Sequence, residues 1–272
     1  MKKDVFKVAA IQMNCVLGNK EENLNKAYSL ITNAAKKQAK LIVLPELFNT
    51  GYRVEEKDME LAERFPGDTI DWMKNIAKEL DIILVACITE ESIVDGVLYD
   101  TAVIVDKRGL QSSYRKIYLW DKENVRFAKG QNYKTCSIEN LDIGLQICYE
   151  VGFPEGARIL TLQGANLLIY PSAFGDARLY AWDIATRARA LENGCFVIAA
   201  NRIGTEKDET TFGGHSRIID PTGKILAEAG DDEQIIIAEI DITLVKEQRR
   251  TIPYLRDLNI PLVINEFNKF KK

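Results

Sequence analysis

Hydrophobic and polar positions follow two alternating periods along this chain. Short apolar runs typical of buried strands are separated by segments in which apolar residues recur every three or four positions, as in amphipathic helices. In the first half, the pattern predicts strands at residues 5–13, 41–44 and 82–88, with helices at 23–40 and 68–80. This order is typical of βαβ units, in which a helix connects two parallel strands.

The second half repeats the alternation after a predicted hairpin. Strands at 98–105 and 110–118 flank the turn sequence DKRG. The later elements are strands at 141–148, 166–170, 195–200, 216–219, 225–229 and 234–240, and helices at 154–163 and 180–192. We therefore predict one α/β domain over residues 1–243, built of two βαβ-like halves. A tail at 244–272 follows, with too little apolar periodicity to form a core element.

Composition and charge narrow the class of protein. The chain has 272 residues, of which 46% are hydrophobic and 28% charged, enough for a sizeable core. The net charge is −4 and no long basic tract is present, which argues against nucleic acid as a partner. The first residues lack the apolar core of a signal peptide, and no run approaches the ~18 apolar residues of a membrane span. A cytoplasmic protein with no membrane partner is expected.

One of the cysteines is a first candidate for a catalytic residue. The five cysteines are widely spaced and include no CxxC pair, which argues against a disulfide framework or a zinc site. Cys148 stands where a predicted strand ends, and Pro154 is a good opener for a helix whose positive end would favour a thiolate. The residue is thus a candidate nucleophile. Taken alone, it is better explained as a small buried hydrophobe that caps the strand.

Two charged residues share this placement at the ends of strands. Glu46 follows the strand at 41–44 in an apolar setting that would raise its carboxyl pKa toward that of a general base. Lys116 lies near the end of the strand that begins at residue 110. Taken alone, Glu46 is better explained as a solvated loop carboxylate, and Lys116 as a charge that keeps an edge strand from pairing. The only histidine, His215, leaves a Cys–His pair open, but a carboxylate base with a lysine is better supported, because the oxyanion needs a fixed positive donor.

Three segments around these residues resemble the signatures of a known family. LIVLPELFNTGY, YRKIYLW and ICYEVGFPE look like those of the nitrilase superfamily, or carbon–nitrogen hydrolases. The resemblance continues through ANLLIYPSAF, TRARALENGCFVIAANRIG and HSRIIDPTGKILAEAG and so covers nearly the whole chain. It implies an αββα sandwich that dimerises into a four-layer-type body. It also implies a triad of Glu46, Lys116 and Cys148, with Glu123 as a second glutamate near the site.

The resemblance also implies a mechanism that requires no metal or organic cofactor. Glu46 would take the proton of Cys148, whose thiolate attacks the amide carbon to form a thioester and release ammonia. Lys116 and the backbone N–H of Tyr149 would stabilise the oxyanion. Ser172, in the segment that ends at residue 174, is a further candidate for positioning the substrate.

The residue four positions after the candidate nucleophile limits the substrate. Many family members that act on carboxylate-bearing amides have an arginine there, whereas this chain has Gly152. We therefore expect an amidase for a small neutral or cationic amide, or an N-carbamoylamine hydrolase. A nitrilase and an ω-amidase-like hydrolase are the alternatives with the same triad.

Two more distant alternatives and the oligomeric state complete the expectations. A glutamine amidotransferase would normally carry a fused synthetase domain, for which this chain has no room. A non-catalytic binding member of the family is disfavoured by the intact triad. We expect a homodimer or a higher homo-oligomer, with the helix at 180–192 and the tail, including Tyr254 and Leu255, at the contact.

Overall fold

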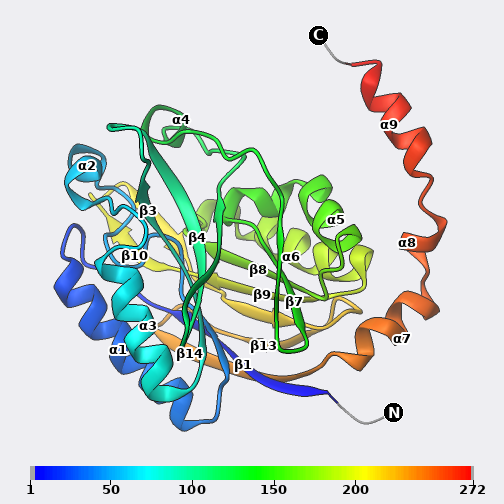
Figure 1. Ribbon diagram of the computed structural model, residues 1–272, viewed down its shortest axis with the longest axis horizontal. Helices are drawn as coiled ribbons and strands as arrows, with labels where there is room; N and C mark the ends of the chain where they lie inside the picture. The colour runs from blue at the N-terminus through cyan, green and yellow to red at the C-terminus, as the bar shows by residue number, and fades with distance from the viewer. Residues whose placement is uncertain (1–3, 271–272) are drawn as a thin grey trace.

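Two six-stranded sheets lie face to face in the computed structural model, which describes residues 4–270 (Figure 1). The first sheet has the order β14-β1-β2-β3-β4-β5, and the second has the order β13-β12-β9-β8-β7-β6. The strands of the first sheet are β1 (Val5–Gln12), β2 (Leu41–Val43), β3 (Ile83–Glu91), β4 (Leu98–Asp106), β5 (Gly109–Arg115) and β14 (Gln234–Asp241). Those of the second are β6 (Thr135–Ile138), β7 (Leu141–Leu145), β8 (Leu167–Ser172), β9 (Phe196–Asn201), β12 (Arg217–Ile219) and β13 (Ile225–Glu228).

Helices cover the outer face of each sheet. Helices α1 (Lys20–Lys36) and α3 (Asp68–Leu80) pack on the first sheet, and α5 (Pro154–Leu162) and α6 (Leu179–Asn193) pack on the second. Strands β1 and β2 are parallel, as are β7, β8 and β9, so each half contains the predicted βαβ connection. The predicted αββα sandwich of two similar halves is confirmed.

The layers follow from which face of each strand is apolar. In β1, Val8 and Ala10 pack between the two sheets, whereas Ala9 and Ile11 pack toward the helices. Successive side chains of a strand point to opposite faces, so a strand buried on both faces is continuously apolar. This is why the strands of this chain appear as short apolar runs without alternation.

Several predicted boundaries are wrong by a few residues, and two of the errors fall at the site. The strand predicted at 141–148 ends at Leu145, and Cys148 opens a 3₁₀ helix, Cys148–Gly152. The strand predicted at 110–118 ends at Arg115, which leaves Lys116 just beyond it. The helix predicted at 23–40 begins at Lys20, because the Asn19 side chain caps its first turn, and ends at Lys36.

The smaller elements were not predicted. A two-stranded ribbon pairs β10 (Ile203–Glu206) with β11 (Thr210–Gly213), and short helices occur at α2 (Asp58–Leu61) and α4 (Glu123–Arg126). These segments are too short to show a period in the sequence. Both α4 and the ribbon lie beside the candidate site, so their placement bears on its chemistry.

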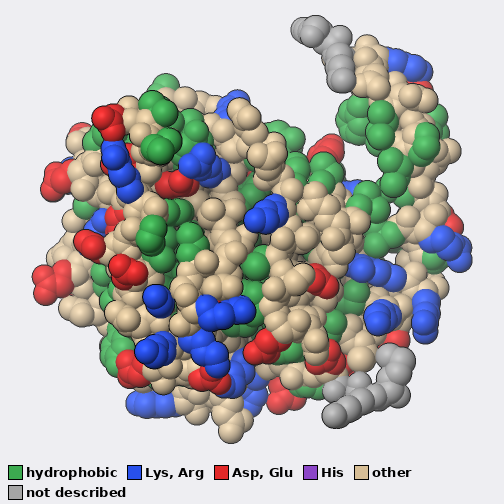
Figure 2. Space-filling view, viewed as in Figure 1, with side chains coloured by type: hydrophobic (Ala, Val, Ile, Leu, Met, Phe, Trp, Pro, Cys, Tyr) green, Lys and Arg blue, Asp and Glu red, His purple; other side chains and the backbone are tan. Residues whose placement is uncertain are grey.

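The tail is helical and leads away from the sandwich (Figure 1). It consists of α7 (Thr243–Thr251), α8 (Tyr254–Asp257) and α9 (Ile260–Asn268). Val245 of α7 is buried against the body, but Ile264 and Phe267 of α9 are more than half exposed. The space-filling view shows apolar side chains on this arm that the body does not cover (Figure 2). None of the helices within residues 4–270 is both long enough and apolar enough to cross a membrane.

Candidate active site

Glu46 is held in a fully buried loop directly after β2. Its Oε2 accepts a hydrogen bond of 2.7 Å from the backbone N–H of Ala173, and its Oε1 accepts one of 2.6 Å from the Lys116 ammonium. The next residue, Leu47, has φ of 49°, a left-handed conformation that turns the chain sharply. The predicted pairing of Glu46 with Lys116 is therefore present, and both side chains point into the interface between the sheets.

Lys116 lies among three carboxylates. Its Nζ is 2.6 Å from Glu46, 2.8 Å from Glu123 and 3.2 Å from Asp100. All four side chains are buried, so water does not screen their charges. One oxygen from each carboxylate lies within 4.8 Å of the others, a geometry that could hold a metal ion. The Lys116 ammonium donates hydrogen bonds to Glu46 and Glu123 and forms an ion pair with Asp100, so it supplies a positive charge to all three carboxylates.

The pKa values of both Glu46 and Lys116 are raised in this cluster. Burial raises the pKa of Glu46 to about 7; Lys116 opposes the shift and Asp100 adds to it. The pKa of Lys116 lies well above its usual value, because Glu123, Glu46 and Asp100 outweigh the effect of burial. The lysine is therefore a permanent cation, and Glu46 can give up or accept a proton near neutral pH. This confirms the raised pKa expected for Glu46 from its apolar neighbours.

Cys148 lies at a sharp turn beside this cluster. Its φ of 47° is in the left-handed region, which a non-glycine residue adopts at a cost of about 1–3 kcal/mol, and its side chain is 6% exposed. Burial raises the pKa of the thiol well above the usual value; Glu46 adds to the shift, whereas Lys116 lowers the pKa. Desolvation is the largest cause of this shift, so the thiol is not ionised by its surroundings and needs a base to deprotonate it.

Glu150 holds the turn of the nucleophile against the loop that carries the lysine. Its Oε1 accepts hydrogen bonds from the Tyr114 hydroxyl at 2.7 Å and from the backbone N–H groups of Ile117 and Tyr118 at 2.9 and 3.2 Å. Its Oε2 accepts one of 2.8 Å from the N–H of Ile147. The backbone N–H groups of Ile117, Tyr118 and Ile147 thus donate to the Glu150 carboxylate and not to a neighbouring strand. This explains why both predicted strands end early.

Glu123 lies where the resemblance implies, and two further residues at the site were missed. Besides Lys116, Glu123 accepts a hydrogen bond of 2.6 Å from the Tyr52 hydroxyl and one of 2.8 Å from the N–H of Trp120. Tyr52 and Asp100 had not been singled out. A charged residue inside the otherwise apolar strand at 98–105 was a usable signal for Asp100. No comparable signal marked Tyr52.

A chamber of about 170 Å³ opens above Cys148. Tyr149 and Gly152 line it, as predicted for residues near a substrate, and a side chain at Gly152 would meet open space. Ser172 does not line it among the described residues: its hydroxyl donates to the Tyr170 carbonyl, and its own carbonyl accepts the N–H of Glu46 at 3.4 Å. We therefore place Ser172 in support of Glu46 and not in contact with the substrate.

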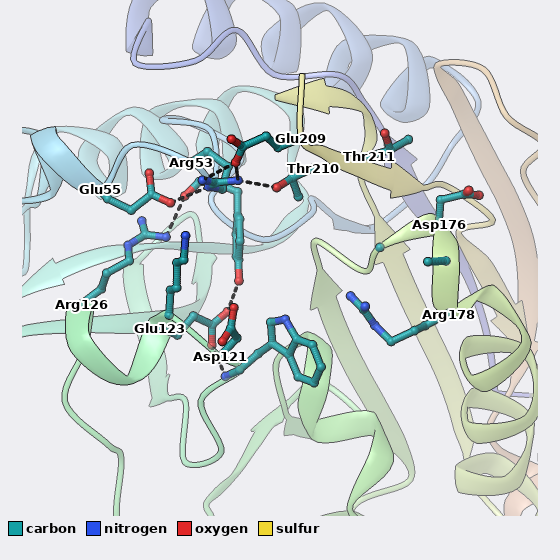
Figure 3. A pocket seen from close by; sticks show the side chains of 15 residues that line it. Arg53, Glu55, Asp121, Glu123, Arg126, Asp176, Arg178, Glu209, Thr210 and Thr211 are labelled. Carbon is teal, nitrogen blue, oxygen red and sulfur yellow. Dashed lines mark hydrogen bonds and ion pairs between the residues drawn. The ribbon is translucent and has the colours of Figure 1, made fainter. Parts of the chain in front are cut away.

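A wider, polar chamber of about 460 Å³ adjoins the first and shares part of its wall (Figure 3). Both chambers are lined by the same five residues, Tyr52, Trp120, Gly175, Arg178 and Thr210. The outer chamber adds charged side chains from α4 and from the loop between β10 and β11. We call this wider, charged chamber the vestibule; it adjoins the mostly apolar chamber around Cys148.

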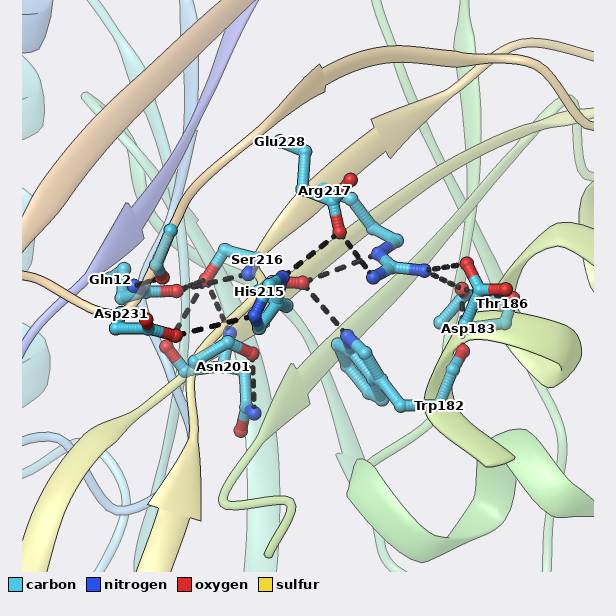
Figure 4. Close-up of polar contacts among 12 residues, drawn as sticks. Gln12, Trp182, Asp183, Thr186, Asn201, His215, Ser216, Arg217, Glu228 and Asp231 are labelled. Atoms are coloured by element: carbon cyan, nitrogen blue, oxygen red, sulfur yellow. Dashed lines mark hydrogen bonds and ion pairs between the residues drawn. The ribbon is translucent and has the colours of Figure 1, made fainter. Parts of the chain in front are cut away.

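His215 belongs to a different cluster, at the start of β12 (Figure 4). Its Nδ1 lies 3.2 Å from Glu228 and its Nε2 lies 3.4 Å from Asp231. Arg217 bonds the same Glu228 and also Asp183. Both ring nitrogens thus face carboxylates outside the chamber, and the Cys–His pair left open by the sequence is excluded.

Comparison with known proteins agrees with this architecture. The family described as "Carbon-nitrogen hydrolase" matches residues 7–250. The chain is 36% identical over 264 residues to a protein named nitrilase from Pyrococcus abyssi, with 94% of this chain and 95% of the relative covered. It is 34% identical over 279 residues to omega-amidase NIT2 of Homo sapiens, with 97% and 99% covered.

Two solved structures have the same fold. Nit3 of Saccharomyces cerevisiae, described as a member of branch 10 of the nitrilase superfamily, aligns with a TM-score of 0.86 at 32% identity and covers 92% of this chain and 94% of its own. A carbon–nitrogen hydrolase of Helicobacter pylori G27 aligns with a TM-score of 0.91 at 29% identity, covering 98% and 99%.

The αββα sandwich and a cysteine beside a buried Glu–Lys pair define a class of thiol hydrolases. The chain belongs to the carbon–nitrogen hydrolase family of the nitrilase superfamily. It is therefore an enzyme, and the superfamily inferred from the three sequence segments is confirmed.

The raised pKa of Glu46 predicts how activity depends on pH. Only the carboxylate form can accept the Cys148 proton, so kcat/KM for a neutral amide should rise with pH and level off above about 7. Below that value, the rate should fall about tenfold per pH unit. Initial rates of ammonia release across about pH 5 to 9 measure the profile.

A second buried carboxyl needs a control, because burial also raises the pKa of Glu150 to about 7. The Tyr114 hydroxyl lowers that pKa, so Tyr114→Phe should raise it and leave the activity profile in place. A profile that moves with Tyr114→Phe would assign the titration to Glu150 instead. A flat profile would contradict the role of Glu46 as base.

Proposed function

We propose that the protein hydrolyses the C–N bond of a small amide through a thioester on Cys148 and releases ammonia. The observation that supports this most directly is a buried Glu46–Lys116 pair beside a cysteine that lines a small chamber. The Lys116 Nζ lies 2.6 Å from the Glu46 Oε1. A base with a pKa near neutrality, a permanent cation and a thiol are the groups that this chemistry requires.

The first half of the reaction forms the thioester. Glu46 accepts the thiol proton, and the thiolate adds to the amide carbon while the C=O electron pair moves onto oxygen. Lys116 and the backbone N–H of Tyr149 bind this oxyanion. The C–N bond then breaks, and the nitrogen leaves as ammonia after it takes the proton from Glu46. Glu123 keeps Lys116 in place through its 2.8 Å contact.

The second half restores the enzyme. Glu46 removes a proton from water, which adds to the thioester carbon, and the C–S bond breaks to give a carboxylic acid and the Cys148 thiol. Glu46 thus serves twice as base, and its pKa of about 7 suits both the gain and the loss of a proton. The steps use only protein groups, the amide and water.

A nitrilase is the second candidate, because a relative at 36% identity carries that name. A nitrile would form a thioimidate on the same cysteine, and water would then give either the acid or the amide. An ammonia-release screen over amides, N-carbamoyl amines and nitriles, with product analysis, separates the candidates. The Cys148→Ala variant serves as the blank. Ammonia from nitriles but not from amides would contradict the amidase proposal.

We also propose that the protein forms a homodimer through α6 and the C-terminal arm. Tyr180 and Ile184 of α6 are 71% and 66% exposed and lie one turn apart on the same side of the helix. The arm exposes Leu262, Ile264 and Phe267, each by more than half. Exposed apolar surface on this scale is typical of an interface. The contact expected from the resemblance therefore has surfaces on this chain that fit it.

Removal of residues 253–272 is expected to convert a dimer into a monomer. Arg249 of α7 remains tied to the body through the carbonyls of Ala165 and Asn193, so the shortened chain should stay folded. Sedimentation velocity at micromolar concentration measures the change. A full-length Phe267→Asp variant is the matched control, and it should weaken the dimer without shortening the chain. A monomeric full-length protein would rule out the proposal.

A further inference from the structure

The chamber above Cys148 contains a single charged side chain among the described residues that line it, that of Arg178. The rest of the wall is aromatic or small and includes Trp120, Phe174 and Ala181. Arg178 stands at the end of a short 3₁₀ helix, Asp176–Arg178, that leads into α6. It also lines the outer chamber, so its guanidinium lies where the vestibule meets the reaction chamber (Figure 3).

Two neighbours fix the position of this guanidinium. Its carbon lies 4.6 Å from the centroid of the Trp120 ring, a cation–π contact. At Gly175, an added Cβ would lie 2.8 Å from Nη2, so the guanidinium rests close to the backbone there. Stacking uses the face of the guanidinium and leaves N–H groups on its edge free to donate. Those N–H groups are the ones that bind a carboxylate in bidentate fashion.

No protein anion pairs with Arg178 within residues 4–270, although other arginines of the vestibule are paired. Arg53 bonds Glu55 and Glu209, and Arg126 bonds Asp58. The vestibule acids Asp121 and Asp176 are exposed and lie among residues that line only the outer chamber. Arg178 is half-buried. A cation that is partly desolvated and lacks a partner favours an anion brought by the ligand.

We propose that Arg178 binds a carboxylate on the substrate, so that the enzyme prefers an amide that carries a negative charge at its far end. The inference rests on the proposed amidase function and names its substrate class. It reverses the neutral or cationic preference expected from Gly152. The chain lacks an arginine at that position, but the fold places one on another wall of the same chamber.

The test compares amides that differ only in charge. The probes are the monoamides of malonic, succinic and glutaric acid, the neutral 4-methylpentanamide and the cationic 4-aminobutanamide. Wild-type enzyme is expected to favour the best monoamide by about 10- to 100-fold in kcat/KM over the neutral probe, the range for a charge-assisted pair. Arg178→Gln should remove this preference, chiefly through a higher KM for the monoamides. Arg178→Lys should recover part of it.

A matched control removes a charge that faces only the vestibule. Lys122 lines the outer chamber and not the inner one, so Lys122→Gln should keep the preference. Two results would overturn the inference and leave the amidase function standing. One is a wild type that cleaves the neutral or cationic amide as well as the monoamides. The other is an Arg178→Gln variant that loses activity on all probes alike. Absence of ammonia from every amide would overturn both.

Discussion

Replacement of Lys116 by methionine is expected to abolish measurable ammonia release and to lower the free energy of unfolding by about 3–5 kcal/mol. The substitution leaves three buried carboxylates within 4.8 Å of one another without the cation that all three contact. In the proposed mechanism, it also removes a donor to the oxyanion. Chemical denaturation followed by circular dichroism, together with the ammonia assay, measures both effects.

The loss of stability in Lys116→Met should depend on pH in a definite direction. Lys116 lowers the pKa of Glu46, which burial has raised, so without the lysine this pKa lies further above its unfolded value and the folded state binds a proton that the unfolded state releases. Stability must then fall as pH rises, and the deficit of Lys116→Met should be smaller near pH ~5 than near pH ~8.

A neighbouring lysine provides the control. Lys122→Met removes an exposed charge close by and should change the unfolding free energy by less than about 0.5 kcal/mol. Adding Glu123→Gln to Lys116→Met should restore part of the stability, because one carboxylate fewer is left unpaired, but no activity. Wild-type stability in Lys116→Met would show that the ammonium does not hold the cluster together.

Cys148→Ala is expected to reduce turnover by about 10⁴-fold or more without unfolding the protein. The thioester cannot form without the sulfur, whereas the core loses only one buried atom at a turn already constrained by the hydrogen bonds of Glu150. The folded variant should still bind substrate, since the chamber walls and Arg178 remain. A substrate-dependent rise in its Tm, beside the absence of ammonia, is the expected result.

Cys195 is a suitable control for this variant. It is also fully buried, but in the core beneath α6 and not at the chamber, so Cys195→Ala should keep normal turnover. Mass spectrometry of acid-quenched wild type during turnover should show an acyl adduct on the peptide that contains Cys148. Turnover by Cys148→Ala at a tenth of the wild-type rate or more would exclude the covalent route.

The sequence by itself determined the fold class and the main catalytic candidates. Residues 8–11 and 41–44 place apolar side chains in the core on both faces of the first sheet, and such strands can be identified from composition because both neighbours are nonpolar layers. Glu46 and Cys148 could be singled out because each ends an apolar run, at the edge of the sheets where ligands bind. The three signature segments then identified the superfamily.

Only the tertiary structure decided the surroundings of these residues. Asp100 and Tyr52 join the site from β4 and from the loop after Glu46, and Glu150 links two loops that lie far apart in the chain. The rise in the pKa of the Cys148 thiol depends on burial and on the charges packed nearby.

The substrate argument changed for the same reason. Gly152 is close to Cys148 in sequence and could be judged from the chain alone, whereas Arg178 is brought to the chamber by the packing of α6 against the second sheet. Local pattern determines which segments are buried, because burial needs only an apolar face. Which charged groups meet depends on how distant segments pack, and that information is absent from any single stretch of sequence.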